Sequence, residues 1–234
     1  MKKIILPLLF VCNFMFSQEI NFSSYNEFLK KYVSENGTVN YEKIQLNIEE
    51  LNAILIQFEK NKPSENASKN EKIAYYINTY NAYTLKTVTD NYPIKSIKDI
   101  KDVWDKKFIP SGKIKISLGN IEHDILRKMN EPRIHFAINC ASFSCPNLSN
   151  SAFLSETLEE QLEFAAKSFI NDKTKNEISE KKVKISEIFK WFSSDFKKNG
   201  NLIDFLNKFS AIKINMKAKV KYFRLQLEFK QLNQ

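Results

Sequence analysis

The stretch Lys72–Val88, KIAYYINTYNAYTLKTV, carries the longest helical spacing of apolar residues in the chain and decides how the fold is organised. Upstream, Ser68 and Glu71 have the spacing of a capping box, which starts helices. Downstream, Pro93 follows Tyr92, and a residue that precedes proline avoids the helical conformation. We therefore expect one long helix, against which the neighbouring segments pack.

Outward from this helix, the chain alternates between helical and extended patterns. We expect further helices over residues 21–33, 48–60, 96–104, 117–129, 157–170, 186–198 and 201–209. We expect strands over residues 113–117, 133–140 and 182–186, and in the tail, where Phe223, Leu225, Leu227 and Phe229 alternate with polar residues. The pattern predicts an α+β fold: a helix-rich single domain with a small, mainly antiparallel sheet.

The N-terminus has the layout of a secretory signal peptide, with two lysines, a short apolar stretch and then polar residues. We expect cleavage after Ser17 and a single domain over residues 18–234, with its core at about residues 32–209. The apolar stretch is shorter than the roughly 20 residues that a membrane span needs. We therefore expect an exported protein, periplasmic or extracellular, with no membrane span after cleavage.

The formal net charge of +9 comes from lysines that are scattered and interspersed with acidic residues. A dense basic tract would favour nucleic acid, whereas this distribution favours a solvated basic surface. We expect no nucleic-acid partner and no cofactor.

Two asparagines lie on the apolar stripe of the long helix. Asn78 and Asn81 follow Ile77 at helical spacing and precede Leu85 on the same face. Buried amides need hydrogen-bond partners. They either fix the backbone of neighbouring loops or bind a ligand, for example as donors to an oxyanion.

The segment RIHFAINCASFSCPNL, residues 133–148, contains Cys140 and Cys145. Four interpretations stay open: a disulfide, inert buried thiols, a zinc site shared with the histidines, or a nucleophile with a histidine base. The spacing His, 11 residues, His, 4 residues, Cys, 4 residues, Cys is not typical of zinc sites, so we expect no metal.

The chain has only two histidines, His123 and His135, so a histidine base must be one of them. His123 is predicted near a helix start, where the helix dipole lowers its pKa and favours the neutral imidazole. His135 is predicted on the strand, on the same face as Arg133 and opposite Cys140.

Four segments occur in an order that resembles the bacterial "domain of unknown function 547" family, over most of the chain. They are YYINTYNAYTLKTVTDNYPIKSIKDI, ISLGNIEHDILR, EPRIHFAINCASFSCPNL and FKWFSSDF. The resemblance implies a protein that is often exported, and a rearranged papain-like or transglutaminase-like core. The family's Asn-Leu-Tyr-Asn motif falls on residues 78–81, its Glu-His pair on Glu122 and His123, and its Cys-Gly-Ala-x-Ser-Cys-Pro segment on residues 140–146.

Two departures from the family pattern affect these expectations. Ala141 stands where the family often has glycine, which concerns any oxyanion-binding N–H at that position. The tail also lacks the family's Tyr-Asp-Trp-Ser-Leu-Asn signature.

Two functions remain open. The first is a cysteine-dependent amide hydrolase or acyl transferase that acts on envelope peptides, with Cys140 as nucleophile, His123 as base and Glu122 as the group that orients the base. Asn78, Asn81, Cys145, His135 and Arg133 are then binding residues. The second is a non-catalytic binding or scaffold module for peptides or polymers of the cell envelope, which predicts that no open cleft joins His123 to Cys140.

Overall fold

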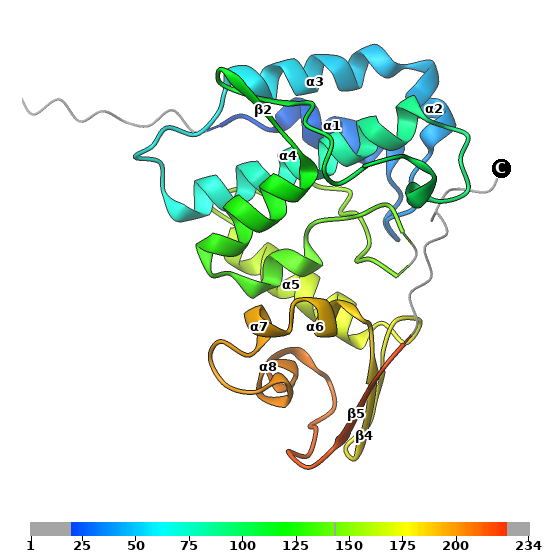
Figure 1. The fold of residues 1–234 in the computed structure, drawn as a ribbon, viewed down its shortest axis with the longest axis vertical. Helices are drawn as coiled ribbons and strands as arrows, with labels where there is room; N and C mark the ends of the chain where they lie inside the picture. The colour runs from blue at the N-terminus through cyan, green and yellow to red at the C-terminus, as the bar shows by residue number, and fades with distance from the viewer. Residues whose placement is uncertain (1–19, 143, 224–234) are drawn as a thin grey trace, which may run out of the picture.

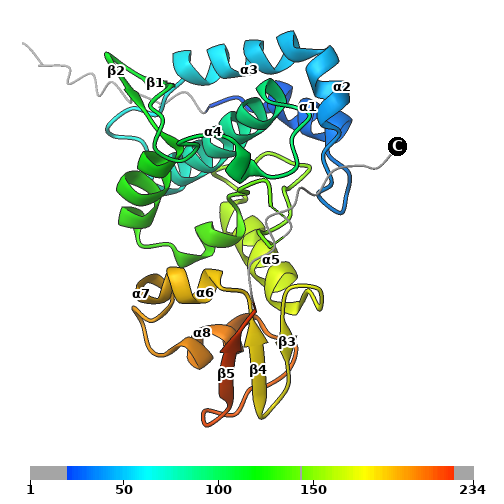
Figure 2. The ribbon, with the colours of Figure 1, turned by 45° about the vertical axis from the view of Figure 1, so that its right-hand side comes forward.

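The computed structural model describes residues 20–142 and 144–223. The predicted signal peptide and the tail strand from residue 224 onward lie outside these residues. The first half of the fold is built on four α-helices, α1 (Ser23–Tyr32), α2 (Tyr41–Leu46), α3 (Ile48–Lys60) and α4 (Lys69–Asp90). Helix α4 crosses the middle of the molecule beneath the others (Figures 1 and 2).

The long helix α4 begins and ends as predicted. The side chain of Ser68 accepts a hydrogen bond from the backbone of Glu71, which caps the first turn. Fourteen of its residues are buried, among them Asn78 and Asn81. The predicted amphipathic helix α3 is also confirmed, with its apolar stripe buried at Leu51, Ile54, Leu55 and Phe58.

Short elements follow α4. They are the 3-10 turn η1 (Ile97–Asp99), the hairpin β1 (Ile109–Ser111) with β2 (Ile114–Ile116), the π-helix η2 (Asn120–Leu126), and the 3-10 turns η3 (Arg127–Met129) and η4 (Pro132–Phe136). The second half contains α5 (Leu158–Asn171), β3 (Glu177–Ile178), β4 (Lys182–Ile185), α6 (Ile188–Trp191), α7 (Ser193–Phe196), α8 (Leu202–Phe209) and β5 (Lys219–Tyr222).

The two sheets are small. Strands β1 and β2 pair antiparallel, with Ile109 opposite Ile116. The second sheet has the order β3-β4-β5, in which β4 is antiparallel to β3 and parallel to β5. The fold is therefore α+β, helix-rich, with one antiparallel sheet and one mixed sheet. Within the described residues, no helix has both the length and the apolar character needed to cross a membrane.

The predicted strand over residues 133–140 is wrong. Pro132 begins the 3-10 turn η4, and the side chain of Glu131 accepts a hydrogen bond from the backbone of Arg133 at its start. The alternation of apolar residues there reflects packing in two directions. Ile134 belongs to the first hydrophobic core, whereas Phe136 belongs to the second.

The two cores explain the shape seen in Figure 2, in which α5, α6, α7, α8 and the mixed sheet lie below the first four helices. The first core gathers residues from Phe22 to Leu162, and the second gathers Phe136 with residues from Ala166 to Ile214. Phe136 contacts the rings of Phe169, Phe189, Phe196 and Phe205.

Candidate functional site

One pocket of about 500 Å³ brings together most of the predicted site residues. Its lining includes both histidines, both cysteines of the described chain and one predicted catalytic carboxylate: His123, His135, Cys140, Cys145 and Glu122. The rest of the wall is mainly apolar, namely Tyr80, Ile97, Trp104, Ile138, Pro146, Ile188, Trp191 and Phe192. The pocket draws residues from both cores, so it lies where they meet.

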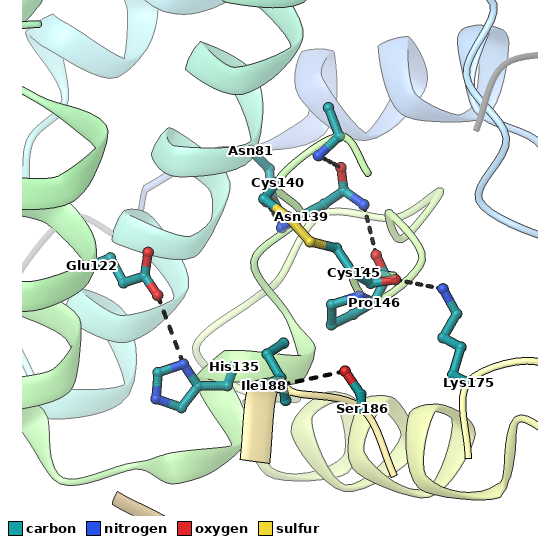
Figure 3. The surroundings of a disulfide bond; sticks show 11 residues. Asn81, Glu122, His135, Asn139, Cys140, Cys145, Pro146, Lys175, Ser186 and Ile188 are labelled. Atoms are coloured by element: carbon teal, nitrogen blue, oxygen red, sulfur yellow. Dashed lines mark hydrogen bonds and ion pairs between the residues drawn. A yellow bond between two sulfur atoms is a disulfide. The ribbon is translucent and has the colours of Figure 1, made fainter. Parts of the chain in front are cut away.

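The two sulfur atoms are joined in a disulfide between Cys140 and Cys145, whose Cα atoms are 6.0 Å apart (Figure 3). Of the four interpretations of the cysteines, the disulfide is the one that the structure contains. Cys145 is 5% exposed, and Cys140 is half-buried. Among the described residues, no group of three or more His, Cys, Asp or Glu side chains is arranged to hold a metal ion.

The asparagines of α4 hold loop backbone. The amide of Asn81 donates to the carbonyl of Ala137 at 3.0 Å and accepts from the N–H of Asn139 at 2.8 Å. The amide of Asn78 makes the same pair of bonds with the backbone of Phe153, at 2.8 and 2.9 Å. Both side chains are thus committed to positioning loops, and Asn81 fixes the residue that precedes Cys140.

The disulfide loop is tied down on its other sides as well. The side chain of Asn139 accepts from the N–H of Ala141 at 2.8 Å and donates to the carbonyl of Pro146 at 2.6 Å (Figure 3). The buried Lys175 donates to the carbonyl of Cys145. Ala141 has φ of 53°, the left-handed conformation that glycine adopts at least cost. The N–H of Ala141, a predicted oxyanion donor, is therefore used within the loop.

Glu122 and His123 lie on the π-helix η2, a local distortion that often occurs at functional sites. Nδ1 of His123 lies 3.2 Å from Nη1 of Arg127. Since the guanidinium is only a donor, Nδ1 accepts that hydrogen bond and its lone pair is occupied. Burial, followed by the charge of Arg127, lowers the pKa of His123, which is the direction predicted from the sequence.

His135 is oriented by Asp195, a carboxylate that was not predicted from the sequence to lie at the site. Nε2 of His135 lies 2.8 Å from Oδ2 of Asp195, which also accepts from Nε of Arg127 at 2.7 Å. The imidazole stacks on the ring of Phe192, with 3.9 Å between centroids. Burial raises the pKa of Asp195, but hydrogen bonds from His135 and Arg127 outweigh it and hold that pKa well below its usual range.

The protonation of His135 follows from these contacts. An ionised Asp195 can only accept, so Nε2 of His135 carries a proton and donates it. Burial lowers the pKa of His135, which keeps the ring neutral and leaves Nδ1 as an acceptor. Nδ1 has no hydrogen-bond partner within the described part of the chain. It lies 3.9 Å from Oε1 of Glu122 (Figure 3).

The carboxyl group of Glu122 is the most perturbed acid of the pocket lining. Burial raises its pKa to about 7; the charge of Arg127 opposes this rise, and that of Asp195 adds to it. Its Oε1 lies 3.9 Å from Nδ1 of His135, so the carboxylate predicted to orient His123 lies beside the other imidazole. A carboxyl group that titrates near neutrality in a pocket is typical of a functional site.

Arg133, a predicted binding residue, lies elsewhere. Its guanidinium forms ion pairs with Glu131 at 2.7 Å and with Glu159 at 2.6 Å. These contacts connect η4 to α5, and Arg133 is not among the residues that line the pocket. We therefore assign Arg133 a structural role, which is to hold η4 against α5.

Comparison with known protein families gives one match. Residues 64–170 match the family described as "Protein of unknown function, DUF547". The matched segment contains α4, the π-helix η2 and the disulfide loop, and the segment as a whole supplies most of the residues that line the pocket. Neither the curated proteins nor the solved structures gave a match to the chain.

Proposed function

Because the chain belongs to the DUF547 family, whose function is undefined, its activity has to be inferred from its own pocket, and we propose a cysteine-dependent amide hydrolase or acyl transferase that reduction activates. The observation that carries this proposal is that both cysteines and both histidines line one pocket. A nucleophilic thiol and a nearby base are the minimum that such chemistry needs.

The first step of the proposed reaction is reduction of the disulfide. A dithiol reductant converts the Cys140–Cys145 bond into two thiols and becomes a disulfide itself, so two electrons and two protons enter the loop. Cys140, the more exposed of the two, is the proposed nucleophile. Its proton passes to a pocket imidazole, and the thiolate attacks an amide carbonyl. The amine leaves with that proton, and water or a second nucleophile then resolves the thioester.

His135 is the better supported base. Its Nδ1 has no hydrogen-bond partner among the described residues, and its ring is oriented by Asp195, the arrangement that positions an imidazole for proton transfer. His123, the base expected from the sequence, has its acceptor nitrogen turned to Arg127 and comes second. Removal of the proton acceptor should slow the reaction of Cys140 without changing which cysteine reacts.

Alkylation with iodoacetamide at about pH 6 tests the proposal. An ordinary thiol of pKa near 8.5 is almost fully protonated at that pH and reacts slowly. The C145A variant frees Cys140 without any reductant, and we expect rapid labelling there, assigned by peptide mass mapping. The matched C140A variant leaves the buried Cys145, and we expect slow labelling. Adding H135Q to C145A should slow Cys140 about tenfold or more, and adding H123Q should slow it less.

A result in which Cys140 of C145A reacts no faster than free cysteine contradicts the proposal. In that case the second candidate, a non-catalytic binding module, accounts for the structure better. It is favoured by the disulfide itself and by the use of Asn78 and Asn81 on loop backbone. The cleft that this second candidate excluded is present, so a binding module has to use the pocket as its ligand site.

The proposed location is the cell envelope or the extracellular space, with envelope peptides as substrates. The support is the N-terminal sequence, together with a disulfide, which persists mainly in oxidising compartments. Fractionation and N-terminal sequencing test this part. A mature protein that begins at Gln18 in the exported fraction supports it, and an uncleaved protein in the cytoplasm contradicts it.

A further inference from the structure

At the polar end of the pocket, two hydrogen-bond acceptors receive no hydrogen bond from the residues that the structure describes. Nδ1 of His135 belongs to a side chain that is 1% exposed, and it has no hydrogen-bond partner in the described structure. The carboxyl group of Glu122 is 14% exposed, and no hydrogen bond joins it to another described residue. The two groups are 3.9 Å apart, which is too long for a hydrogen bond between them. A buried polar group without a partner is costly, so the missing partner is informative.

The walls around these acceptors favour a cation. Aromatic rings of Trp104 and Trp191 line the same pocket, and aromatic faces attract positive charge. The charged lining consists of Lys98 against Asp105 and Glu122, so it carries one excess negative charge when Glu122 is ionised.

We propose that the pocket binds an organic ammonium group on an apolar body, with Glu122 and Nδ1 of His135 accepting its N–H donors. An ammonium group has three donors and so can satisfy both acceptors at once. A carboxylate ligand would bring only further acceptors and negative charge. A neutral alcohol has one donor and leaves the charge of Glu122 unpaired. The inference concerns the pocket with the disulfide closed, so it stands or falls separately from the thiol chemistry above.

The ligand class predicts a dependence on pH. An ammonium ion pairs with the ionised form of Glu122, whose pKa burial raises to about 7. The groups that face this carboxyl group from the surrounding elements are Tyr80 of α4, Arg127 of η3, His135 of η4 and Asp195 of α7. Affinity should therefore rise about tenfold for each pH unit below 7 and level off above it, which is about 50-fold between pH 5 and pH 7. Protonation of His135 at low pH would remove Nδ1 as an acceptor and act in the same direction.

The protein carries its own reporter for this experiment. It contains two tryptophans, and both line the pocket. We would titrate the full, oxidised protein with 2-phenylethylamine and follow tryptophan fluorescence at pH 5 and pH 7. The matched probes are 2-phenylethanol, which keeps the apolar body without the charge, and 3-phenylpropionate, which reverses the charge.

We expect a saturable change with the amine that is about 50-fold weaker at pH 5, and at least tenfold weaker binding of both matched probes at pH 7. The E122Q variant should lose most of the pH dependence and should bind the amine at least tenfold more weakly at pH 7. The matched D124N variant, an exposed carboxylate on the same π-helix that does not line the pocket, should bind like the wild type.

Equal affinity for the amine and the alcohol at pH 7 would overturn the proposal. So would binding of the amine that is equal at pH 5 and pH 7, or the absence of saturation with the amine. These comparisons use the wild-type protein alone, so they decide the matter even if E122Q does not fold. If the amine binds as expected and alkylation of Cys140 is slow, the pocket is an amine site without thiol catalysis.

Discussion

Replacement of Glu122 by glutamine should change how the stability of the protein responds to pH. The carboxyl group has an ordinary pKa of 4.5, and burial raises it to about 7 in the folded protein. The folded state therefore binds the proton more tightly than the unfolded state does. The contribution to stability is fully present below pH 4.5 and is lost as the pH rises through 7. At 1.36 kcal/mol per pH unit, the loss is about 3 kcal/mol.

Glutamine has the same shape and stays neutral, so E122Q should not show this loss. The quantity to follow is the difference in free energy of unfolding between wild type and E122Q. Relative to E122Q, the wild type should lose about 3 kcal/mol of unfolding free energy between pH 4.5 and pH 8. Using the difference matters because the lowered pKa values of His123 and His135 act with the opposite sign as the pH falls.

Urea denaturation at five pH values, followed by far-ultraviolet circular dichroism with the disulfide intact, measures this difference. The control is E49Q, an exposed carboxylate in the first turn of α3, which should follow the wild type. A constant difference between wild type and E122Q over this pH range would refute the reasoning, because Glu122 would then be ionised in the folded protein at no cost.

Three further predictions concern Asn81, the disulfide loop that it helps to hold, and Arg133 of η4. N81A should cost about 2 to 5 kcal/mol of unfolding free energy, because two backbone groups lose their partners, whereas the exposed N91A should cost under about 1 kcal/mol; urea denaturation of both variants checks this. Replacing Cys140 and Cys145 together by serine should lower the free energy of unfolding by about 2 kcal/mol, as expected for the loss of a short closed loop. Reduction of the wild-type disulfide should have a similar effect, and equal stability of the oxidised and reduced protein would contradict this prediction. R133M removes the ion pairs that connect η4 to α5 and should lower the free energy of unfolding by about 1 to 3 kcal/mol, measured by urea denaturation. It should leave ligand binding to the pocket unchanged, as measured by tryptophan fluorescence.

The helices could be predicted from the sequence where local signals agree with the packing. Helix α4 has a capping serine, a proline after its end and an apolar stripe, and all three are present in the structure. The amides of Asn78 and Asn81 were expected to be buried with partners, and they are. What the sequence left open was the partner, because each of these bonds reaches more than 50 residues along the chain.

The segment after Pro132 could not be predicted because its pattern serves two cores at once. Alternation of Ile134 and Phe136 is typical of a strand, yet here it sends neighbouring side chains into different clusters. Asp195 was missed for a related reason. It lies 60 residues after His135, and spacing alone does not connect them; only the segment FKWFSSDF, noted for its family resemblance, pointed to that region.

The position of Phe136 also bears on how the molecule comes apart. Phe136 lies in the second core, whereas Ile134, two residues before it, and Ala137, directly after it, lie in the first core. The same turn holds the imidazole that Asp195 of α7 binds. If either core unfolded, the turn η4 would lose its packing in the other core as well. The two halves should therefore melt together as one cooperative unit. A ligand seated between the halves would raise the melting temperature of both by the same amount.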